Sequence, residues 1–342
     1  MAKLRYLIVG SGWRSLFYLR VAQALPERFE VCAMLCRTPE KAERMHREYG
    51  APVSTSVEEC IAMQPDVVVV AVNKAAIAAV SREWLERGFA VLCETPAALD
   101  EDTLHALWQL HVQGAKLQVA EQYWLYPSLS RRLAAVHSGA LGRVRFARLS
   151  VAHGYHAASL ARQFLGAGQQ PVRITGQRWT ERVVETDSRW GIVEHGAPVE
   201  KELQRHTLEF AGGGVAFLDF CGVQYHSFLR STHTGVQGER GELFDDTLRW
   251  LDETGTPQCR QLSDAPSLLV RQAMQAGLNE DETAIAQFLD WMQAYASGGA
   301  EVYPLADALQ DAYLALLMEH ALQQPQPVQS RPQPWNETGG TV

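Results

Sequence analysis

Apolar runs and segments with helical spacing alternate along the first 120 residues. Five short apolar runs have the length and character of buried strands, and they lie at residues 4–9, 31–35, 67–72, 90–93 and 117–120. Between them, apolar residues recur at helical spacing, and several of these segments begin with residues that cap helices, namely Thr38-Pro39, Ser56 and Asp100. Strands that alternate with helices in this order predict a doubly wound parallel sheet.

The pattern changes after residue 121. A strand at 144–151 and a helix at 156–165 are followed by strand-rich segments at 207–221, 227–237 and 242–251. Successive strands without helices between them indicate an antiparallel sheet. Two helices at 281–296 and 305–322 complete the pattern. We therefore expect an α/β fold in three parts, which are a parallel-sheet domain at 1–121, an α+β domain at 122–322, and a Pro/Gln-rich, extended or poorly ordered tail at 323–342.

Composition and charge exclude several classes of partner. The net charge of −8 argues against a nucleic acid, and no apolar stretch reaches the roughly 18 residues of a membrane span. The N-terminus lacks the apolar region and cleavage site of a signal peptide. The six cysteines form no Cys-x-x-Cys pair, which predicts free thiols in a reducing cytoplasm. The His, Cys and carboxylate residues do not cluster at ligand spacing, so we expect no metal site.

A glycine-rich turn joins the first strand to the first helix. It reads Gly10-Ser11-Gly12-Trp13-Arg14-Ser15, where a dinucleotide-binding turn has the pattern G-x-G-x-x-G. The first glycine permits the tight turn, the second lets the backbone approach the diphosphate, and the third position packs helix against strand. Backbone N–H groups at the helix start would bind the diphosphate. Residues 1–121 are thus predicted to be a dinucleotide-binding Rossmann domain, the alternative being a glycine turn that binds nothing.

The residues after the second strand bear on the choice of cofactor. NAD-binding domains place an Asp or Glu there to bind the ribose hydroxyl groups. This chain has Cys36-Arg37-Thr38 instead, and a guanidinium with a hydroxyl suits a 2′-phosphate. The pattern favours NADP. The alternative is that Arg37 stacks on the adenine and that NAD binds as well.

Several motifs occur in an order and spacing that resemble one family, the Gfo/Idh/MocA oxidoreductases related to glucose–fructose oxidoreductase and inositol dehydrogenase. The likeness covers nearly the whole chain and rests on residues 9–12, 37–42, 65–71, 88–96, 119–123 with Pro127, 138–142 and 154–156. The resemblance implies a Rossmann domain followed by a domain with a large, mostly antiparallel sheet. It also implies a sugar or polyol substrate bound between the domains, and a homodimer or homotetramer formed through the flat face of that sheet.

The resemblance also implies a set of cofactor-binding residues. These are Gly10, Ser11, Gly12, Trp13, Arg14, Arg37, Thr38, Ala71, Val72, Asn73, Glu94, Thr95, Pro96 and Gln122.

The chain departs from the family pattern where proton transfer is expected. The usual Glu-Lys-Pro is Glu94-Thr95-Pro96 here, and a threonine hydroxyl does not titrate near neutral pH. The usual Asp-x-x-x-His has Ala152 in place of the carboxylate and keeps His156. Where many members have Thr-Pro after the fourth strand, this chain has Val72-Asn73-Lys74.

Three residues are the candidates for catalysis. His156 is the expected acid or base, because an imidazole exchanges protons near neutral pH. Thr95 would hydrogen-bond the substrate or relay a proton, and Tyr123 would orient the substrate, as would His153 and Tyr155 beside it. Lys74 is a further candidate to replace the missing amine. Alternatively, His156 only begins an apolar helix, and Tyr123 with Trp124 belongs to the core.

Other residues of the second domain are not assigned by sequence. Three histidines, His206, His226 and His233, fall on the expected sheet, where alternate positions face opposite sides. Residues 178–198, with Trp179 and Trp190, are expected to form an irregular surface loop, with a loop over the active site as the alternative.

Three functions remain open. The first is an NAD(P)-dependent oxidoreductase acting on a small, polar, sugar-like alcohol or carbonyl. The second is a redox-neutral glycosidase or lyase that recycles a tightly held cofactor. The third is a non-catalytic dinucleotide-binding sensor, since the usual lysine is replaced by Thr95.

Overall fold

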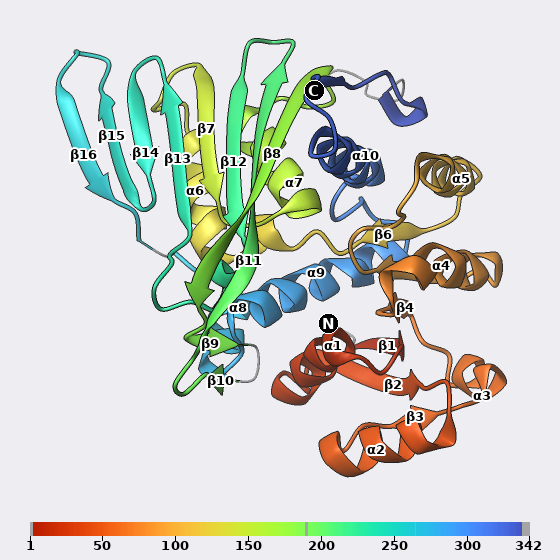
Figure 1. The fold of residues 1–342 in the computed structure, drawn as a ribbon. Helices are drawn as coiled ribbons and strands as arrows, with labels where there is room; N and C mark the ends of the chain where they lie inside the picture. Colours follow the sequence, from red (N-terminus) through yellow and green to blue (C-terminus); the bar gives the residue numbers. More distant parts are fainter. Residues whose placement is uncertain (1–2, 189–190, 264, 337–342) are drawn as a thin grey trace. The chain divides into compact units, whose positions relative to one another are not determined.

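The structure is a computed structural model that describes residues 3–188, 191–263 and 265–336 (Figure 1). The chain divides into two compact units. The first comprises Met1–Pro127 with Ala265–Ala312, and the second comprises Ser128–Asp264 with Tyr313–Val342. This division differs from the boundaries expected at 121 and 322, because residues 265–312 return to the first unit.

The first unit contains a six-stranded parallel sheet in the order β3-β2-β1-β4-β5-β6. Its strands are β1 (Leu4–Val9), β2 (Phe29–Leu35), β3 (Val53–Ser54), β4 (Val67–Val70), β5 (Ala90–Cys93) and β6 (Leu117–Val119). The four valines of β4 are fully buried, as expected for a strand covered on both faces. The strand order reverses between β1 and β4, and in open α/β sheets ligands bind outside the carboxyl ends of the strands at such a point.

The first unit also contains helical elements. They are α1 (Trp13–Ala24), α2 (Pro39–Tyr49), α3 (Val57–Ala62), η1 (Lys74–Ala76), α4 (Ile77–Glu86), α5 (Glu101–Val112), η2 (Tyr123–Leu125), α8 (Leu268–Gln275) and α9 (Glu280–Ala296). Side chains of Thr38, Ser56 and Asp100 each accept a backbone N–H three residues later. The predicted parallel α/β sheet and the helix starts at these three capping residues are confirmed.

Polar contacts explain why α9 belongs to the first unit. Arg20 of α1 pairs with the buried Glu282, and Arg28 donates to Asp290 at 2.6 Å. At the other end of α9, Lys116 donates to the carbonyl of Ala296 at 2.6 Å. These bonds attach a late segment of the sequence to the early sheet.

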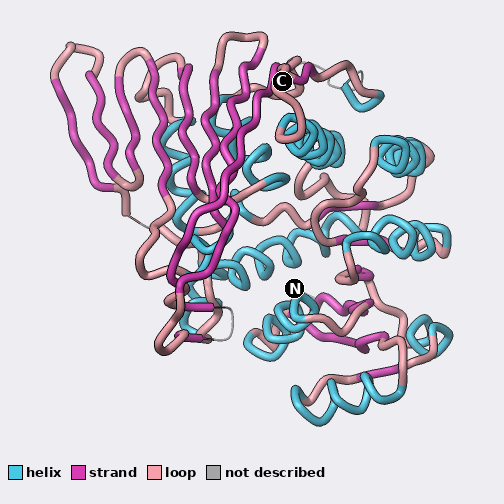
Figure 2. The backbone as a smooth tube through the Cα atoms, in the orientation of Figure 1, coloured by secondary structure: helices cyan, strands magenta, loops and turns pink. Residues whose placement is uncertain are grey.

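The second unit is built on a nine-stranded sheet in the order β16-β15-β14-β13-β7-β12-β11-β8-β17. Its strands are β7 (Val144–Ser150), β8 (Val172–Val184), β11 (Pro198–Phe210), β12 (Val215–Cys221), β13 (His233–Gly238), β14 (Gly241–Phe244), β15 (Thr247–Leu251), β16 (Pro257–Gln261) and β17 (Val328–Gln329). Neighbours are antiparallel except β7 and β12. The mostly antiparallel sheet is confirmed, and its strands are drawn in magenta in Figure 2.

Two short strands, β9 (Asp187–Ser188) and β10 (Gly191–Ile192), form a separate ribbon between β8 and β11. The helical elements of the second unit are α6 (Pro127–His137), α7 (Gly154–Leu165), η3 (Gly222–His226) and η4 (Pro334–Asn336). A final helix, α10 (Leu305–Ala321), carries the chain from the first unit into the second.

The two faces of the nine-stranded sheet differ. Ala147 and Leu149 of β7 are buried beside α7, whereas Arg148 between them is exposed. On β12, Phe217 is 37% exposed and its ring lies 5.3 Å from that of Phe146. Because strand side chains alternate, one face packs on helices and the other presents aromatic and charged groups.

One expectation for this unit was wrong. Residues 178–184 are not an irregular loop but the second half of the long strand β8, on which Trp179 lies 42% exposed. Trp190 lies outside the described residues. For the tail, where it is described, the extended alternative applies, since β17 pairs with β8 and Trp335 is fully buried. Its Pro and Gln content suggested an extended chain, and pairing with a sheet edge orders it.

Candidate functional site

The glycine turn is shaped by the end of β4. Gly10 has φ +129°, and a Cβ there would lie 2.3 Å from the carbonyl oxygen of Ala71. The same oxygen accepts a 3.2 Å hydrogen bond from the buried hydroxyl of Ser15. Ser15 thus fills the third glycine position and ties α1 to β4. A Cβ on Gly12, by contrast, would meet no described atom within 4 Å, so this side of the turn leaves space for a diphosphate at the N-terminus of α1.

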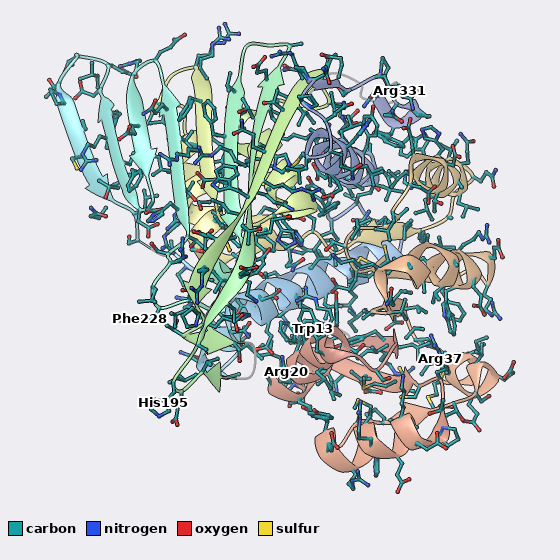
Figure 3. The ribbon with its side chains drawn as sticks, viewed as in Figure 1. Trp13, Arg20, Arg37, His195, Phe228 and Arg331 are labelled. Carbon is teal, nitrogen blue, oxygen red and sulfur yellow. The ribbon has the colours of Figure 1, made fainter. Side chains whose placement is uncertain are left out.

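Cationic side chains gather after β2, where Figure 3 labels Arg37. Arg37 is exposed, as are Lys41 and Arg44 of α2. Within the described parts of the chain, none of these three side chains forms an ion pair. Burial raises the pKa of the Cys36 thiol, and the nearby positive charges of Lys41 and Arg44 partly oppose this rise. The hydroxyl of Thr38 accepts the backbone N–H of Lys41 as the helix cap. The cations are therefore available to a ligand, while Thr38 is already used by its own helix.

Arg14 is held by two carboxylates rather than left open to solvent. Its Nε donates to Glu94 Oε1 at 2.7 Å, and its Nη1 donates to Asp281 Oδ2 at 2.6 Å. Tyr18 donates to the same oxygen of Glu94 at 2.6 Å. Burial lowers the pKa of Arg14, but the two carboxylates outweigh it and raise the pKa well above its usual value.

Gln122, after β6, joins this network. It is 4% exposed, and its Nε2 donates to Asp281 Oδ1 at 3.1 Å. Burial and the nearby carboxylate of Asp281 raise the pKa of Tyr126 well above its usual value. Glu94, Arg14 and Gln122 were predicted site residues, and the structure brings them together. Asp281 and Tyr18 were not predicted, since Asp281 comes 267 residues after Arg14 and nothing local marks it.

The remaining predicted cofactor residues follow β4 and β5. Val72 is half-buried, and Asn73 accepts the backbone N–H of Ala75 at 3.0 Å, so it caps η1. Lys74 is exposed. Thr95 and Pro96 are half-buried and joined by a cis peptide bond directly after Glu94. All of them lie at the carboxyl ends of the strands, the edge to which Gly10 and Gln122 also belong.

Tyr123 is 8% exposed and stacks on Tyr126 with the ring centroids 4.6 Å apart. Trp124 stacks on Trp291 of α9 at 5.8 Å. These contacts favour a packing role for both side chains.

The second unit gathers histidine and aromatic side chains at the start of α7. His153, the residue before the helix, has its Nδ1 3.0 Å from the hydroxyl of Tyr225 and stacks on Phe220. His156, in the first turn, is half-buried with its ring 5.3 Å from that of Tyr155. Ala152, at the position of the usual carboxylate, is buried. Tyr225 and Phe220 were not predicted, because they come from β12 and η3.

The other histidines differ in their surroundings. His206 is 4% exposed, with Nε2 3.2 Å from the carbonyl oxygen of Met318, and burial lowers its pKa to about 4. His233 is exposed, and its ring lies 3.1 Å from Asp245 and 2.9 Å from Ser231. His226 ends η3.

Over residues 3–188, 191–263 and 265–336, no group of three His, Cys, Asp or Glu side chains is placed to hold a metal ion. Within the same ranges, no helix combines the length and apolar character needed to cross a membrane.

Comparisons with known proteins agree with the geometry of the first unit. Residues 4–121 match the family described as "Oxidoreductase family, NAD-binding Rossmann fold". A myo-inositol dehydrogenase, Hyg17 of Streptomyces leeuwenhoekii, is 32% identical over 144 residues, which are 42% of this chain and 44% of that protein. The alignment thus covers less than half of this curated relative.

Solved structures share the fold over nearly all of the chain. An NAD-binding oxidoreductase from Klebsiella pneumoniae has a TM-score of 0.74 at 17% identity, with 97% of this chain and 100% of that chain covered. A levoglucosan dehydrogenase in complex with NADH and levoglucosan has a TM-score of 0.71 at 16% identity, with 96% and 100% covered. Residues 4–121 are thus similar to the NAD-binding Rossmann domain of this oxidoreductase family, and the solved structures show the fold that the chain shares with them.

Proposed function

We propose that the protein is an NAD(P)-dependent oxidoreductase that transfers hydride between nicotinamide C4 and a small, polar, sugar-like alcohol or carbonyl. The observation that carries the proposal is the turn at Gly10–Ser15. Its first glycine is required by the Ala71 carbonyl, and its second leaves space beside a helix N-terminus. Relatives named for myo-inositol and levoglucosan support a polyol or sugar as substrate.

A bound nicotinamide would supply or accept the hydride, and His156 would carry the proton. Thr95 cannot act as the base that the usual lysine provides, so it is assigned a hydrogen bond to the substrate. His156 is half-buried at a helix start and lies in a cluster with Tyr155. Its neighbour His153 is fixed by Tyr225, so this end of α7 presents several polar groups to a sugar-like substrate.

The proposed cofactor is NADP. Arg37, Lys41 and Arg44 place three cations after β2, and no carboxylate stands at positions 36–38 to meet a ribose hydroxyl. A guanidinium binds the 2′-phosphate through paired, charge-assisted hydrogen bonds.

We further propose a homodimer or homotetramer in the cytoplasm. The exposed face of the nine-stranded sheet carries Phe146 and Phe217, a paired aromatic surface suited to a second copy. The six cysteines are free thiols, which suits a reducing compartment.

Turnover of a substrate panel tests the activity. Purified protein is incubated with NADPH or NADP⁺ and a set of sugars, polyols, keto-sugars and imines, and the absorbance of the reduced nicotinamide is followed. We expect His156→Ala to lower turnover by about 10²- to 10⁴-fold with cofactor affinity unchanged. His195→Ala, on the exposed connection between β8 and β11, is the control.

Other outcomes identify the alternatives. Product without net change of the cofactor identifies a redox-neutral lyase or glycosidase. Cofactor binding without any product across the panel supports the sensor. Unchanged turnover by His156→Ala contradicts the role assigned to His156.

A further inference from the structure

Among the buried polar atoms of the first unit that have no hydrogen-bond partner within the described parts of the chain, two belong to side chains that both bind Asp281. They are Gln122 Oε1 and Arg14 Nη2, on side chains that are both about nine-tenths enclosed. A buried polar atom without a hydrogen-bond partner costs free energy. Two such atoms in one cluster therefore indicate a bound ligand or another specific cause.

The identity of the Gln122 atoms is fixed by their neighbour. The Nε2 group donates to Asp281 Oδ1, and a carboxylate oxygen can only accept a bond from the amide nitrogen. The other end of the amide is therefore the oxygen, which is an acceptor. Arg14 has Nε and Nη1 committed to Glu94 and Asp281, so Nη2 remains as a donor. The site thus offers one acceptor and one donor.

The charge at this place does not suit the diphosphate. Two carboxylates, Glu94 and Asp281, surround the single guanidinium of Arg14, so the cluster has no surplus positive charge for an anion. A neutral group that both donates and accepts is the better match. A primary carboxamide has this character, with N–H donors and a carbonyl acceptor on the same carbon.

The sheet places this cluster on the nicotinamide side. Arg37 follows β2, on the half of the sheet that runs outward from β1 through β2 to β3, and its charge suits a 2′-phosphate on the adenosine ribose. Glu94 follows β5 and Gln122 follows β6, on the opposite half. A dinucleotide binds across the reversal between the two halves, which brings its nicotinamide to the β4–β6 half.

We propose that Gln122 Oε1 accepts an N–H of the nicotinamide carboxamide and that Arg14 Nη2 donates to the carboxamide oxygen. Arg14 and Gln122 are then specificity-determining residues for the nicotinamide ring, and Asp281 is a positioning residue that orients both. This inference rests on the proposed binding of a nicotinamide dinucleotide.

Affinity for a cofactor analogue tests it without turnover. The 3-acetylpyridine analogue of the preferred dinucleotide replaces the carboxamide NH₂ by a methyl group and keeps the carbonyl. Binding of the dinucleotide and of the analogue to the intact protein is measured by calorimetry. We expect the analogue to bind about tenfold more weakly, because Gln122 Oε1 is left unpaired. Equal affinities overturn this inference alone, whereas no binding of either ligand overturns the proposed function and the inference together.

The variant Gln122→Met adds an independent measurement. We expect it to bind the parent dinucleotide about tenfold more weakly and to lose the preference over the acetylpyridine analogue. The corresponding ADP-ribose, which lacks nicotinamide, reports whether the variant is folded and is expected to bind as before. Gln113→Met, at an exposed position, is the matched control and should keep the preference. If Gln122→Met still prefers the parent dinucleotide over the acetylpyridine analogue, the inference is overturned. If the variant does not fold, the comparison of the two ligands on the unmodified protein decides.

Discussion

Arg14, in the first turn of α1, donates a 2.6 Å hydrogen bond to Asp281, in the first turn of α9, although 267 residues separate them. The same guanidinium binds Glu94 at the end of β5. One side chain therefore ties the glycine turn, the central sheet and a helix from the later part of the chain into a single polar cluster.

Asp281→Asn tests the contribution of this cluster to stability. The amide keeps one oxygen for Gln122 but turns a donor toward Arg14, so a charged hydrogen bond is lost. We expect the free energy of unfolding to fall by about 2 kcal/mol in urea denaturation. Asp290→Asn, in the pair with Arg28 on the same helix, is the control and should cost less, because Arg28 is more exposed than Arg14. Equal losses would contradict a special role for the cluster.

Gly10→Ala and Gly12→Ala separate the two functions of the glycine turn. A Cβ at Gly10 would lie 2.3 Å from the Ala71 oxygen at φ +129°, so we expect a loss of stability of about 2 kcal/mol. A Cβ at Gly12 meets no described atom, so stability should change by less than about 0.5 kcal/mol. Gly12→Ala should nevertheless weaken dinucleotide binding, measured by calorimetry. Unchanged affinity in Gly12→Ala would argue against a diphosphate at this turn.

Arg37→Ala tests the choice of cofactor. If the guanidinium binds a 2′-phosphate, the variant should lose about tenfold or more in affinity for NADP and keep its affinity for NAD within about twofold. Arg47→Ala, on the same helix as Lys41 and Arg44 but beside Glu48, is the control. An equal loss for both cofactors would mean that Arg37 stacks on the adenine instead.

We expect the stability of the protein to depend on pH because His206 is buried. Its pKa is lowered by burial to about 4 in the folded protein, whereas an unfolded histidine titrates near 6.5. Below pH about 6.5 the unfolded chain binds a proton that the folded protein does not, so stability falls as the pH drops toward 4, by up to about 3 kcal/mol. In His206→Gln this part of the fall should be absent. Urea denaturation from pH 7 to 4.5 measures this fall in stability, and His195→Gln is the exposed control. Identical pH profiles for His206→Gln and the unmodified protein would contradict the role of His206.

Some features of the fold could be predicted because they depend on neighbours in sequence. The valine run of β4 requires burial on both faces, and Thr38, Ser56 and Asp100 cap helices through bonds that span three residues. The glycine turn was recognisable for the same reason, since its conformation depends on two glycines within three positions.

Other features depend on contacts that no local pattern encodes. The order of the tail arises because Ser330 exchanges hydrogen bonds with Val172, 158 residues earlier. His206 and His233 looked equivalent in sequence, yet one faces α10 and the other is exposed beside Asp245. Strand register and face decide such differences, and they follow from the assembled sheet.

The sequence by itself determined the glycine turn at residues 10–15, the cationic stretch that begins at Arg37, and the absence of a lysine at Thr95. Only the tertiary structure decided what Arg14 does. The resemblance implied only that Arg14 binds the cofactor, and the packing of α9 against α1 encloses its charge between Glu94 and Asp281. The physical reason is that a buried guanidinium needs carboxylate partners, and the chain supplies one of them from a helix formed 267 residues later.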